Sequence, residues 1–412
     1  MNETFQVPKS FFRTGRYILF WVSSLFSNIG TWMQQIAQPW VVLSLSNSAF
    51  WVGLDSFAMN TPGWLFTLWG GVLADRYDRK RVVLFFQTIQ FLCIITMVIL
   101  LILSWLKVWM IVIISFLVGL TDSLSMPSFQ SIIPSIVEKK DIHKAVSLNS
   151  TQFNLSRILG PAIAGVVIVR FGAVACFSAN AASYIPFFLS LYFIYPSRGL
   201  KLQQEPIEAK PIQQLKEFQK LLFNRQVRIP LMTALVTNMF CAPLITFSVV
   251  LLKNVFHAEL TQFGWAVAAF GTGGLIGAAV TFIPLPPSFK RNIFATGIAI
   301  LSGMIIVAIG LNHSIYVLIA LLIFAGAALT TSNISINTFL QENATNNSRG
   351  RILSMFQLAL SGGISMGALF TGITVSKLNI SNALLINGIF AIAFQICLLW
   401  KQLKTPVAPT LT

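Results

Sequence analysis

Length, composition and charge limit what kind of protein this chain is. Of its 412 residues, 55% are hydrophobic and only 10% are charged, which leaves too little polar surface to cover a water-soluble core of that size. A formal charge of +16 is typical of nucleic-acid binding when basic residues cluster on one soluble face. Here they fall between long apolar runs, so we expect a lipid-embedded chain and no nucleic-acid partner.

The chain contains a series of long apolar runs, and a membrane-crossing helix needs about 20 apolar residues to traverse a hydrocarbon layer of ~30 Å. The first run follows Lys9, Arg13 and Arg16 and is too long and too polar for a signal peptide, so we interpret it as the first helix. Twelve spans are expected, near residues 17–44, 50–73, 81–105, 108–133, 146–168, 172–195, 227–252, 262–285, 291–311, 315–340, 351–374 and 380–400.

Loop charges predict how these spans are oriented. With a cytoplasmic N-terminus, 23 Lys and Arg residues fall inside, four fall outside (Lys107, Arg170, Lys253 and Lys377), and Arg157 lies within a span. This imbalance obeys the positive-inside rule. We therefore expect a multi-pass protein of the inner (cytoplasmic) membrane with both termini in the cytoplasm.

A polar stretch divides the chain into two halves. Residues 198–228 contain seven Lys and Arg and three Glu, too much charge to cross lipid. The expected organisation is an N-terminal six-helix bundle (1–195), a cytoplasmic linker (196–226) and a C-terminal six-helix bundle (227–412).

An internal repeat supports that division. A shift of 207 residues places Ser147, Ser150, Asn154, Gly160 and Gly165 over Ser354, Gln357, Ser361, Gly367 and Gly372. Small and polar residues also match by chance in so biased a composition. A true repeat would predict an all-α membrane protein of two pseudo-symmetric bundles around a central site, a recurring transporter plan.

Three motifs resemble those of the major facilitator superfamily. Residues 71–80 read GVLADRYDRK, which resembles the signature G-x-x-x-D-R-x-G-R-R/K, with Asp78 where the family usually has Gly. Residues 30–45 (GTWMQQIAQPWVVLSL) and 157–165 (RILGPAIAG) are similar to the secretion and efflux branch that contains the enterobactin exporter. In the second half, the equivalent loop near residues 284–292 keeps Lys290 and Arg291 but no acidic residue.

The resemblance implies that the first of these loops acts as a gate latch. In that interpretation Gly71 lets two helices approach, while Asp75, Arg76 and Arg79 make charge-assisted contacts that favour the outward-open form. A second interpretation is a basic loop that only sets topology.

Charged residues at membrane depth are costly and mark function by default. Asp55, Asp122 and Arg157 qualify. Asp122 and Arg157 each lie about ten residues from the inner end of their predicted helices, roughly 15 Å deep, so we expect an ion pair that either couples proton uptake to transport or is purely structural. Asp55 lies near an outer helix end and is either a proton entry group or simply exposed at the interface.

Polar stripes at helical spacing predict a hydrated central cavity, although any single stripe serves equally well in helix packing. Trp32 is expected to stack an aromatic substrate. The cavity-lining candidates are Asn28, Thr31, Trp32, Gln35, Gln38, Asn154, Asn333, Asn337, Gln357 and Ser361.

The motif Gly160, Pro161 and Gly165 resembles the helix-five motif of superfamily antiporters, where a proline permits a bend and glycines permit close packing. We therefore expect a monomeric secondary transporter that exports a small amphipathic molecule, of siderophore or drug type, in exchange for protons. A lysophospholipid flippase of the same fold is the alternative, and a non-transporting sensor or scaffold is a more distant one. The four cysteines are scattered without metal-ligand spacing and no G-x-x-x-x-G-K-S/T loop is present, so we expect no metal, no cofactor and no enzyme activity.

Overall fold

The computed structural model describes residues 15–133, 136–137, 141–193, 223–283, 291–344 and 349–404, and within them all regular structure is helical. The first half contains α1 (Gly15–Ser46), α2 (Ala49–Arg76), α3 (Arg79–Ile102), α4 (Val108–Ile132), α5 (Ile142–Phe171) and α6 (Ala173–Phe193). The second contains α8 (Arg225–Phe240), α9 (Pro243–Asn254), α10 (Leu260–Val280), α11 (Arg291–Leu311), α12 (Ile315–Asn343), α13 (Arg349–Lys377) and α14 (Ile380–Leu403).

These helices make the twelve expected membrane crossings, because α8 and α9 are two parts of one span, Arg225–Asn254. The break falls just before Pro243, which starts α9 and has no backbone N–H to continue the ladder of α8. Ten spans are long and apolar enough to cross a membrane by composition alone. The other two, α1 and α2, are 32 and 28 residues long but include several polar side chains.

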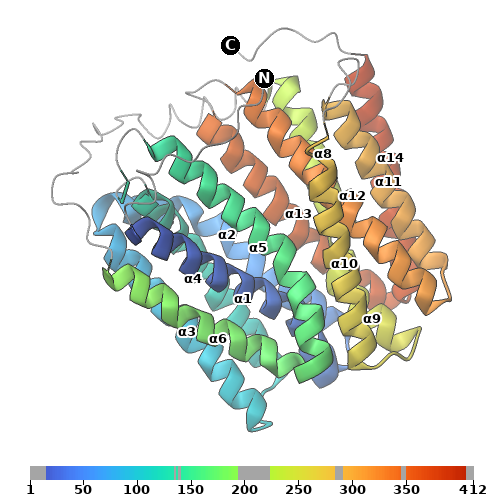
Figure 1. Ribbon diagram of the computed structural model, residues 1–412. Coiled ribbons are helices and arrows are strands. Elements are labelled where there is room, and N and C mark those ends of the chain that lie inside the picture. Colours follow the sequence, from blue (N-terminus) through green and yellow to red (C-terminus); the bar gives the residue numbers. More distant parts are fainter. Residues whose placement is uncertain are drawn as a thin grey trace.

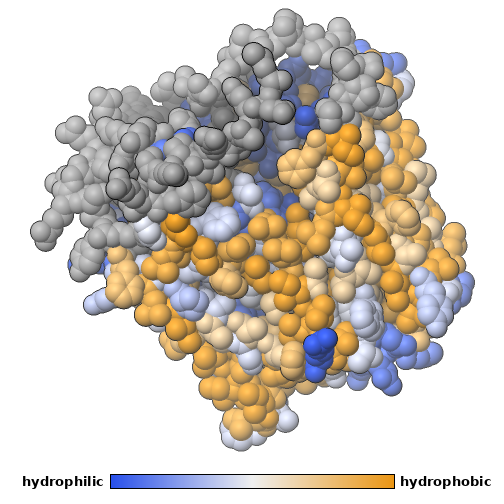
Figure 2. Space-filling model, in the orientation of Figure 1, coloured by the Kyte–Doolittle hydropathy of each residue, from blue (hydrophilic) through white to orange (hydrophobic). Residues whose placement is uncertain are grey.

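The twelve spans form two six-helix bundles, the architecture of the major facilitator fold. Figure 1 shows α1–α6, in blue to green, gathered beside α8–α14, in yellow-green to red. Because the chain makes twelve crossings, α1 starts and α14 finishes at the same end of the molecule. We call that end the terminal side and the opposite end the far side. The outer surface displays many large apolar residues, such as Phe26 and Trp69, and Figure 2 shows it as a broad orange belt. Such a surface is stable in lipid and not in water.

The apolar cores show which side of the molecule is closed. One large cluster joins residues of both bundles, such as Val42 of α1 and Phe247 of α9, and these lie toward the far side. On the terminal side, each bundle has a core of its own: one contains Phe20 and Phe187, the other Leu340 and Phe356. The bundles are therefore sealed together on the far side and have separate cores on the terminal side.

Candidate functional site

The two most extensive contacts between the bundles join α2 with α13 and α5 with α10. Both contacts are made by glycines: Gly53 meets Gly372 in the first pair, and Gly165 meets Gly264 in the second. Absence of a Cβ lets the backbones touch. Ser365 adds polar contacts between α13 and α2: its Oγ lies 3.2 Å from Thr61 Oγ1 and donates to Phe57 O at 3.3 Å. The two bundles therefore meet largely through small residues and backbone, with few large side chains inserted between these helices.

The same positions confirm the pseudo-symmetry expected from the 207-residue shift. Gly160 of α5 packs directly on Trp32 of α1, and its repeat partner Gly367 of α13 packs directly on Met239 of α8. Gly165 and its partner Gly372 each lie at an inter-bundle contact. The glycines of the helix-five motif therefore act in close packing, one within the bundle and one between bundles.

The far side is closed by side chains from both halves. Trp40 of α1 packs on Phe263 of α10 with ring centroids 5.2 Å apart. Lys253 Nζ, at the end of α9, donates to Asn47 Oδ1, just after α1, at 3.1 Å. These contacts would have to break if the far side opened.

The polar residues of α1 that were predicted to line a cavity are only partly accessible. Asn28, Thr31, Trp32 and Gln35 are half-buried, as expected for groups near a cavity, whereas Gln38 is buried. The prediction that Gln38 lines a cavity is therefore wrong for this conformation. Its amide is used inside the bundle instead.

Gln38 belongs to a closed ring of hydrogen bonds with Asp55 of α2 and Ser115 of α4. Gln38 Nε2 donates to Asp55 Oδ2 at 2.7 Å and to Ser115 Oγ at 2.8 Å, and Ser115 Oγ donates to Asp55 Oδ1 at 2.6 Å. Asp55 is only 5% exposed, so interfacial exposure is excluded here. The ring fastens three helices near the far side, and both carboxylate oxygens accept a hydrogen bond.

A chain of amides extends inward from this ring. Gln34 Nε2 donates to Gln38 Oε1 at 3.4 Å, and Asn180 Nδ2 of α6 donates to Gln34 Oε1 at 2.7 Å. Neither Gln34 nor Asn180 was singled out from the sequence. Both are amides in an apolar span, and Gln34 lies one turn from Gln38, so searching for buried amides as well as charges would have found them.

Asp122 occupies a different environment from Asp55. It is the fifteenth of the 25 residues of α4, yet its side chain is exposed. It faces Gln90 of α3 and lies near Tyr184 of α6, and Tyr184 donates to Gln90 Oε1 at 3.1 Å. Gln90 itself is buried, and its Nε2 has no hydrogen-bond partner among the described groups. An accessible carboxylate therefore lies halfway along a membrane helix, beside an unused donor.

The expected ion pair between Asp122 and Arg157 is absent: in the described part of the chain, no salt bridge within 4.0 Å joins them. The reason is that α4 and α5, although consecutive, are not close neighbours. Helix α4 packs mainly on α2 and α3, whereas α5 packs mainly on α1 and α10. Arg157 is half-buried near the middle of α5, together with the half-buried Asn154.

The second bundle contributes neutral polar groups. Asn333 is 5% exposed and exchanges hydrogen bonds with Asn238 of α8, the shorter at 2.9 Å, so it packs helices rather than lining a cavity. Asn337 is half-buried and accepts from Gln341 Nε2 at 3.0 Å. Gln357 is exposed, and the half-buried Ser361 donates to its backbone carbonyl at 2.9 Å. Figure 2 shows hydrophilic residues in the recess between the two apolar halves.

Gly71, near the end of α2, does not make the close helix approach that was predicted for it. A Cβ on Gly71 would meet open space, whereas one on Gly70 would lie 2.6 Å from Ser123 O of α4. The close helix approach is therefore at Gly70. Asp78, where the signature usually has Gly, caps α3 by accepting from Arg81 N at 2.9 Å.

The charged members of the loop lie at the terminal side. Arg76 is exposed, and Arg79 Nη1 donates to Ser131 O of α4 at 3.3 Å. The side chain of Asp75 lies outside the described part of the structure, so the gate latch stays a prediction.

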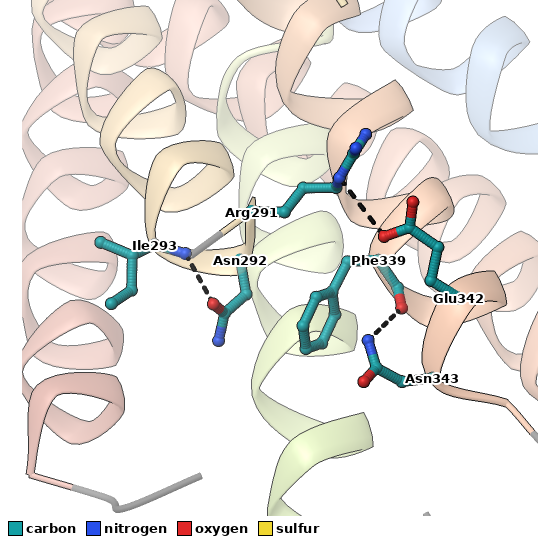
Figure 3. Close-up of polar contacts among 6 residues, drawn as sticks. All are labelled: Arg291, Asn292, Ile293, Phe339, Glu342 and Asn343. Carbon is teal, nitrogen blue, oxygen red and sulfur yellow. Dashed lines mark hydrogen bonds and ion pairs between the residues drawn. The ribbon is translucent and has the colours of Figure 1, made fainter. Parts of the chain in front are cut away.

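In the second bundle, an ion pair lies where α11 begins, which corresponds to the start of α3 in the first bundle. Arg291, at the start of α11, lies 3.4 Å from Glu342, near the end of α12, as Figure 3 shows. The acidic group missing from the second loop is thus supplied by the next helix. Lys290 and most of the predicted linker, residues 196–226, lie outside the described residues.

Comparison with known sequences shows which proteins this chain is similar to. The profile of the family described as "Transmembrane secretion effector" matches residues 7–408. The staphyloferrin A transporter of Staphylococcus aureus is 26% identical over 386 residues, covering 90% of this chain and 93% of the relative. The multidrug efflux pump Tap of Mycolicibacterium fortuitum is 22% identical, covering 92% and 96%.

Solved structures share the fold. A bacterial homologue of the human lysosomal transporter Spinster, in an inward-facing and unoccupied conformation, superposes with a TM-score of 0.73 at 14% identity, covering 97% of this chain and 99% of the other. A D-xylose-proton symporter superposes with a TM-score of 0.69 at 15% identity, covering 93% and 97%.

Proposed function

The chain belongs to the transmembrane secretion effector family of major facilitator transporters, and on that basis we propose that it exports a small amphipathic organic molecule by alternating access in exchange for protons. It is a multi-pass membrane transporter and not an enzyme. The direction of transport, its energy source and the alternating-access mechanism are what we propose in addition.

Alternating access is supported by the arrangement of the cores. The far side has one core spanning both bundles, and the terminal side has two separate cores. A rocking motion needs contacts that break on one side while others persist, and the glycine contacts between α5 and α10 and between α2 and α13 suit such a motion.

Orientation follows from charge. The proposed orientation places the terminal side in the cytoplasm, which the excess of Lys and Arg in the loops expected there supports under the positive-inside rule; the protein is proposed to act as a monomer in the inner membrane. The proposed organisation is an N-terminal bundle (1–195), a cytoplasmic linker (196–226) and a C-terminal bundle (227–412). In this conformation the site is therefore ready to receive a substrate from the cytoplasm.

The observation that carries proton coupling is the accessible carboxylate of Asp122 in the middle of a membrane helix, which forms no salt bridge within the part of the chain that the structure describes. Such a group is costly in a membrane unless it has a function. A carboxylate that water reaches from one side at a time can take up a proton outside and release it inside while substrate moves the other way. Asp55 is enclosed in its hydrogen-bond ring and would exchange protons only after the far side opens.

Relatives suggest the range of cargo. They are named for the transport of staphyloferrin A and of multiple drugs. For this chain the corresponding proposal is a siderophore-type or drug-type molecule, with half-buried Trp32 available to stack against an aromatic ring.

Inverted membrane vesicles with an imposed pH gradient test the proposal. Uptake of staphyloferrin A, erythromycin and a labelled lysophospholipid would be compared in wild type, Asp122→Asn and the matched control Asp141→Asn, whose carboxyl lies before α5 and outside the spans. We expect gradient-driven uptake of one of the first two, retained in the control. In Asp122→Asn we expect gradient-driven uptake to be lost and substrate exchange without a gradient to persist.

Other outcomes would count against specific parts of the proposal. Transport of the lysophospholipid alone would favour the flippase. Wild-type uptake of none of the three would reject the exporter. Full gradient dependence in Asp122→Asn would remove that residue from coupling.

A further inference from the structure

Arg157 lies on the side of α5 that faces away from lipid. One side of α5 packs on α1 through Ser156 and Gly160, and another packs on α10 through Ala162 and Gly165. At 100° per residue, Arg157 lies between those two sides and roughly opposite the exposed, apolar Val166. The stripe that contains Asn154 and Arg157 therefore faces the space between the bundles.

Among the residues that the structure describes, none pairs with the guanidinium of Arg157 in that space. Arg157 is the sixteenth of the 30 residues of α5, and no hydrogen bond or ion pair is formed by its side chain within the described structure. An unpaired cation at membrane depth is expensive, and in functional sites the missing partner is an anion or water. Because α4 and α5 are not close neighbours, Asp122 does not supply that anion.

The surroundings of Arg157 suit an organic anion. Phe153, one turn before Arg157, contacts Trp32 edge to face with ring centroids 6.4 Å apart, and Asn154 adds a half-buried amide. Guanidinium binds a carboxylate through two parallel N–H···O bonds, and aromatic rings accept the apolar part of a ligand.

The positions of the second bundle that correspond to Arg157, Asp122 and Trp32 carry different side chains. The 207-residue shift that superposes the packing glycines places Ile364 opposite Arg157 and Leu329 opposite Asp122. The same shift places Met239 opposite Trp32. The first bundle therefore presents charge, and the second presents apolar groups at the corresponding positions.

We infer that Arg157 is the substrate-anchoring residue, and that the cargo is an amphipathic carboxylic acid held by its carboxylate on the first bundle with its apolar part toward α13. This inference rests on the proposed export function and narrows its substrate class from amphipathic molecules in general to acids. Arg157 is then a binding group, and proton coupling is left to the carboxylates.

Matched pairs of ligands test it directly on the purified full-length protein. The probes are naphthalene-1-acetate, pyrene-1-butyrate and staphyloferrin A, each compared with its carboxamide, and the readouts are calorimetric affinity and ligand-induced thermal stabilisation. For wild type we expect at least one acid to bind and its amide to bind at least about tenfold more weakly, since a charge-assisted pair contributes this much.

Variants on the same helix supply the controls. Arg157→Gln is expected to lose the preference for acid over amide, Arg157→Lys to keep part of it, and Arg170→Gln, at the far end of α5, to keep all of it. The inference is overturned if no acid binds wild type, if acid and amide bind equally, or if Arg157→Gln keeps the preference. Binding and thermal stabilisation need no proton gradient, so wild type that binds acids but transports nothing would reject the export proposal alone.

Discussion

The contact between Gly165 and Gly264 gives a quantitative test of how the bundles meet. A Cβ added to Gly165 would lie 2.5 Å from Gly264 O and 2.7 Å from Ala268 N, whereas ordinary contact begins at 3.4 Å. In Gly165→Ala, α5 and α10 must therefore move apart by about 0.9 Å along the shorter contact. Overpacking of this kind costs about 1–3 kcal/mol.

A control variant separates packing from helix propensity. Alanine is favoured over glycine in a helix by about 1 kcal/mol, and this gain is also made by Gly297→Ala in α11, where a Cβ meets nothing within 4 Å. We expect Gly297→Ala to be as stable as wild type or more stable, and Gly165→Ala to be about 1–3 kcal/mol less stable than that control.

The assay is thermal unfolding of the two purified variants in the same detergent, with the folded fraction followed by size-exclusion fluorescence. If Gly165→Ala melts together with Gly297→Ala, the close backbone contact between the bundles does not exist in the membrane protein. The reasoning about glycine-mediated rocking then fails with it.

Three further predictions follow from single contacts. Gly53→Ala should lower thermal stability by about 1–3 kcal/mol, because the added Cβ would lie 2.6 Å from Ala368 O of α13; an unchanged melting curve would refute the close contact between α2 and α13. Asp78→Ala should lower thermal stability by about 1 kcal/mol, because the cap on α3 is lost, and an unchanged melting curve would refute the cap. A double-mutant cycle on Arg291→Gln and Glu342→Gln should give less than about 1 kcal/mol of coupling, because Glu342 is 53% exposed; a larger value would show a desolvated pair.

Most of the fold could be predicted because apolar length alone nearly determines a membrane helix. The eleventh span was expected at 351–374 and observed as Arg349–Lys377, and the ninth coincides with α11. The break before Pro243 was not predicted, since hydropathy runs across it without change. Periodicity cannot detect a local interruption of hydrogen bonding when both sides are equally apolar.

The site was less predictable, because it depends on which helices are neighbours. The pairing of Asp122 with Arg157 assumed that consecutive helices pack together, and the bundle separates them. Gln35 was predicted to line the cavity, whereas the buried hydrogen-bond network with Gln38 and Asn180 uses Gln34. Gln34 and Gln35 point about 100° apart around the helix. A one-residue shift along a sequence therefore moves a side chain from a cavity-facing position into a buried network.

The two bundles, though related by pseudo-symmetry, differ in the chemistry of their interiors, and this difference bears on how transport is coupled. The second bundle joins several of its buried amides and hydroxyls in neutral pairs, such as Asn238 with Asn333 and Gln395 with Thr237, and neutral pairs need no proton to remain stable in lipid. The first bundle encloses Asp55 and leaves Asp122 and Arg157 unpaired with each other. Under the proposed proton coupling, Asp55 and Asp122 of the first bundle are the carboxylates that would respond to the gradient. The second bundle would then serve as the apolar surface against which the first bundle moves.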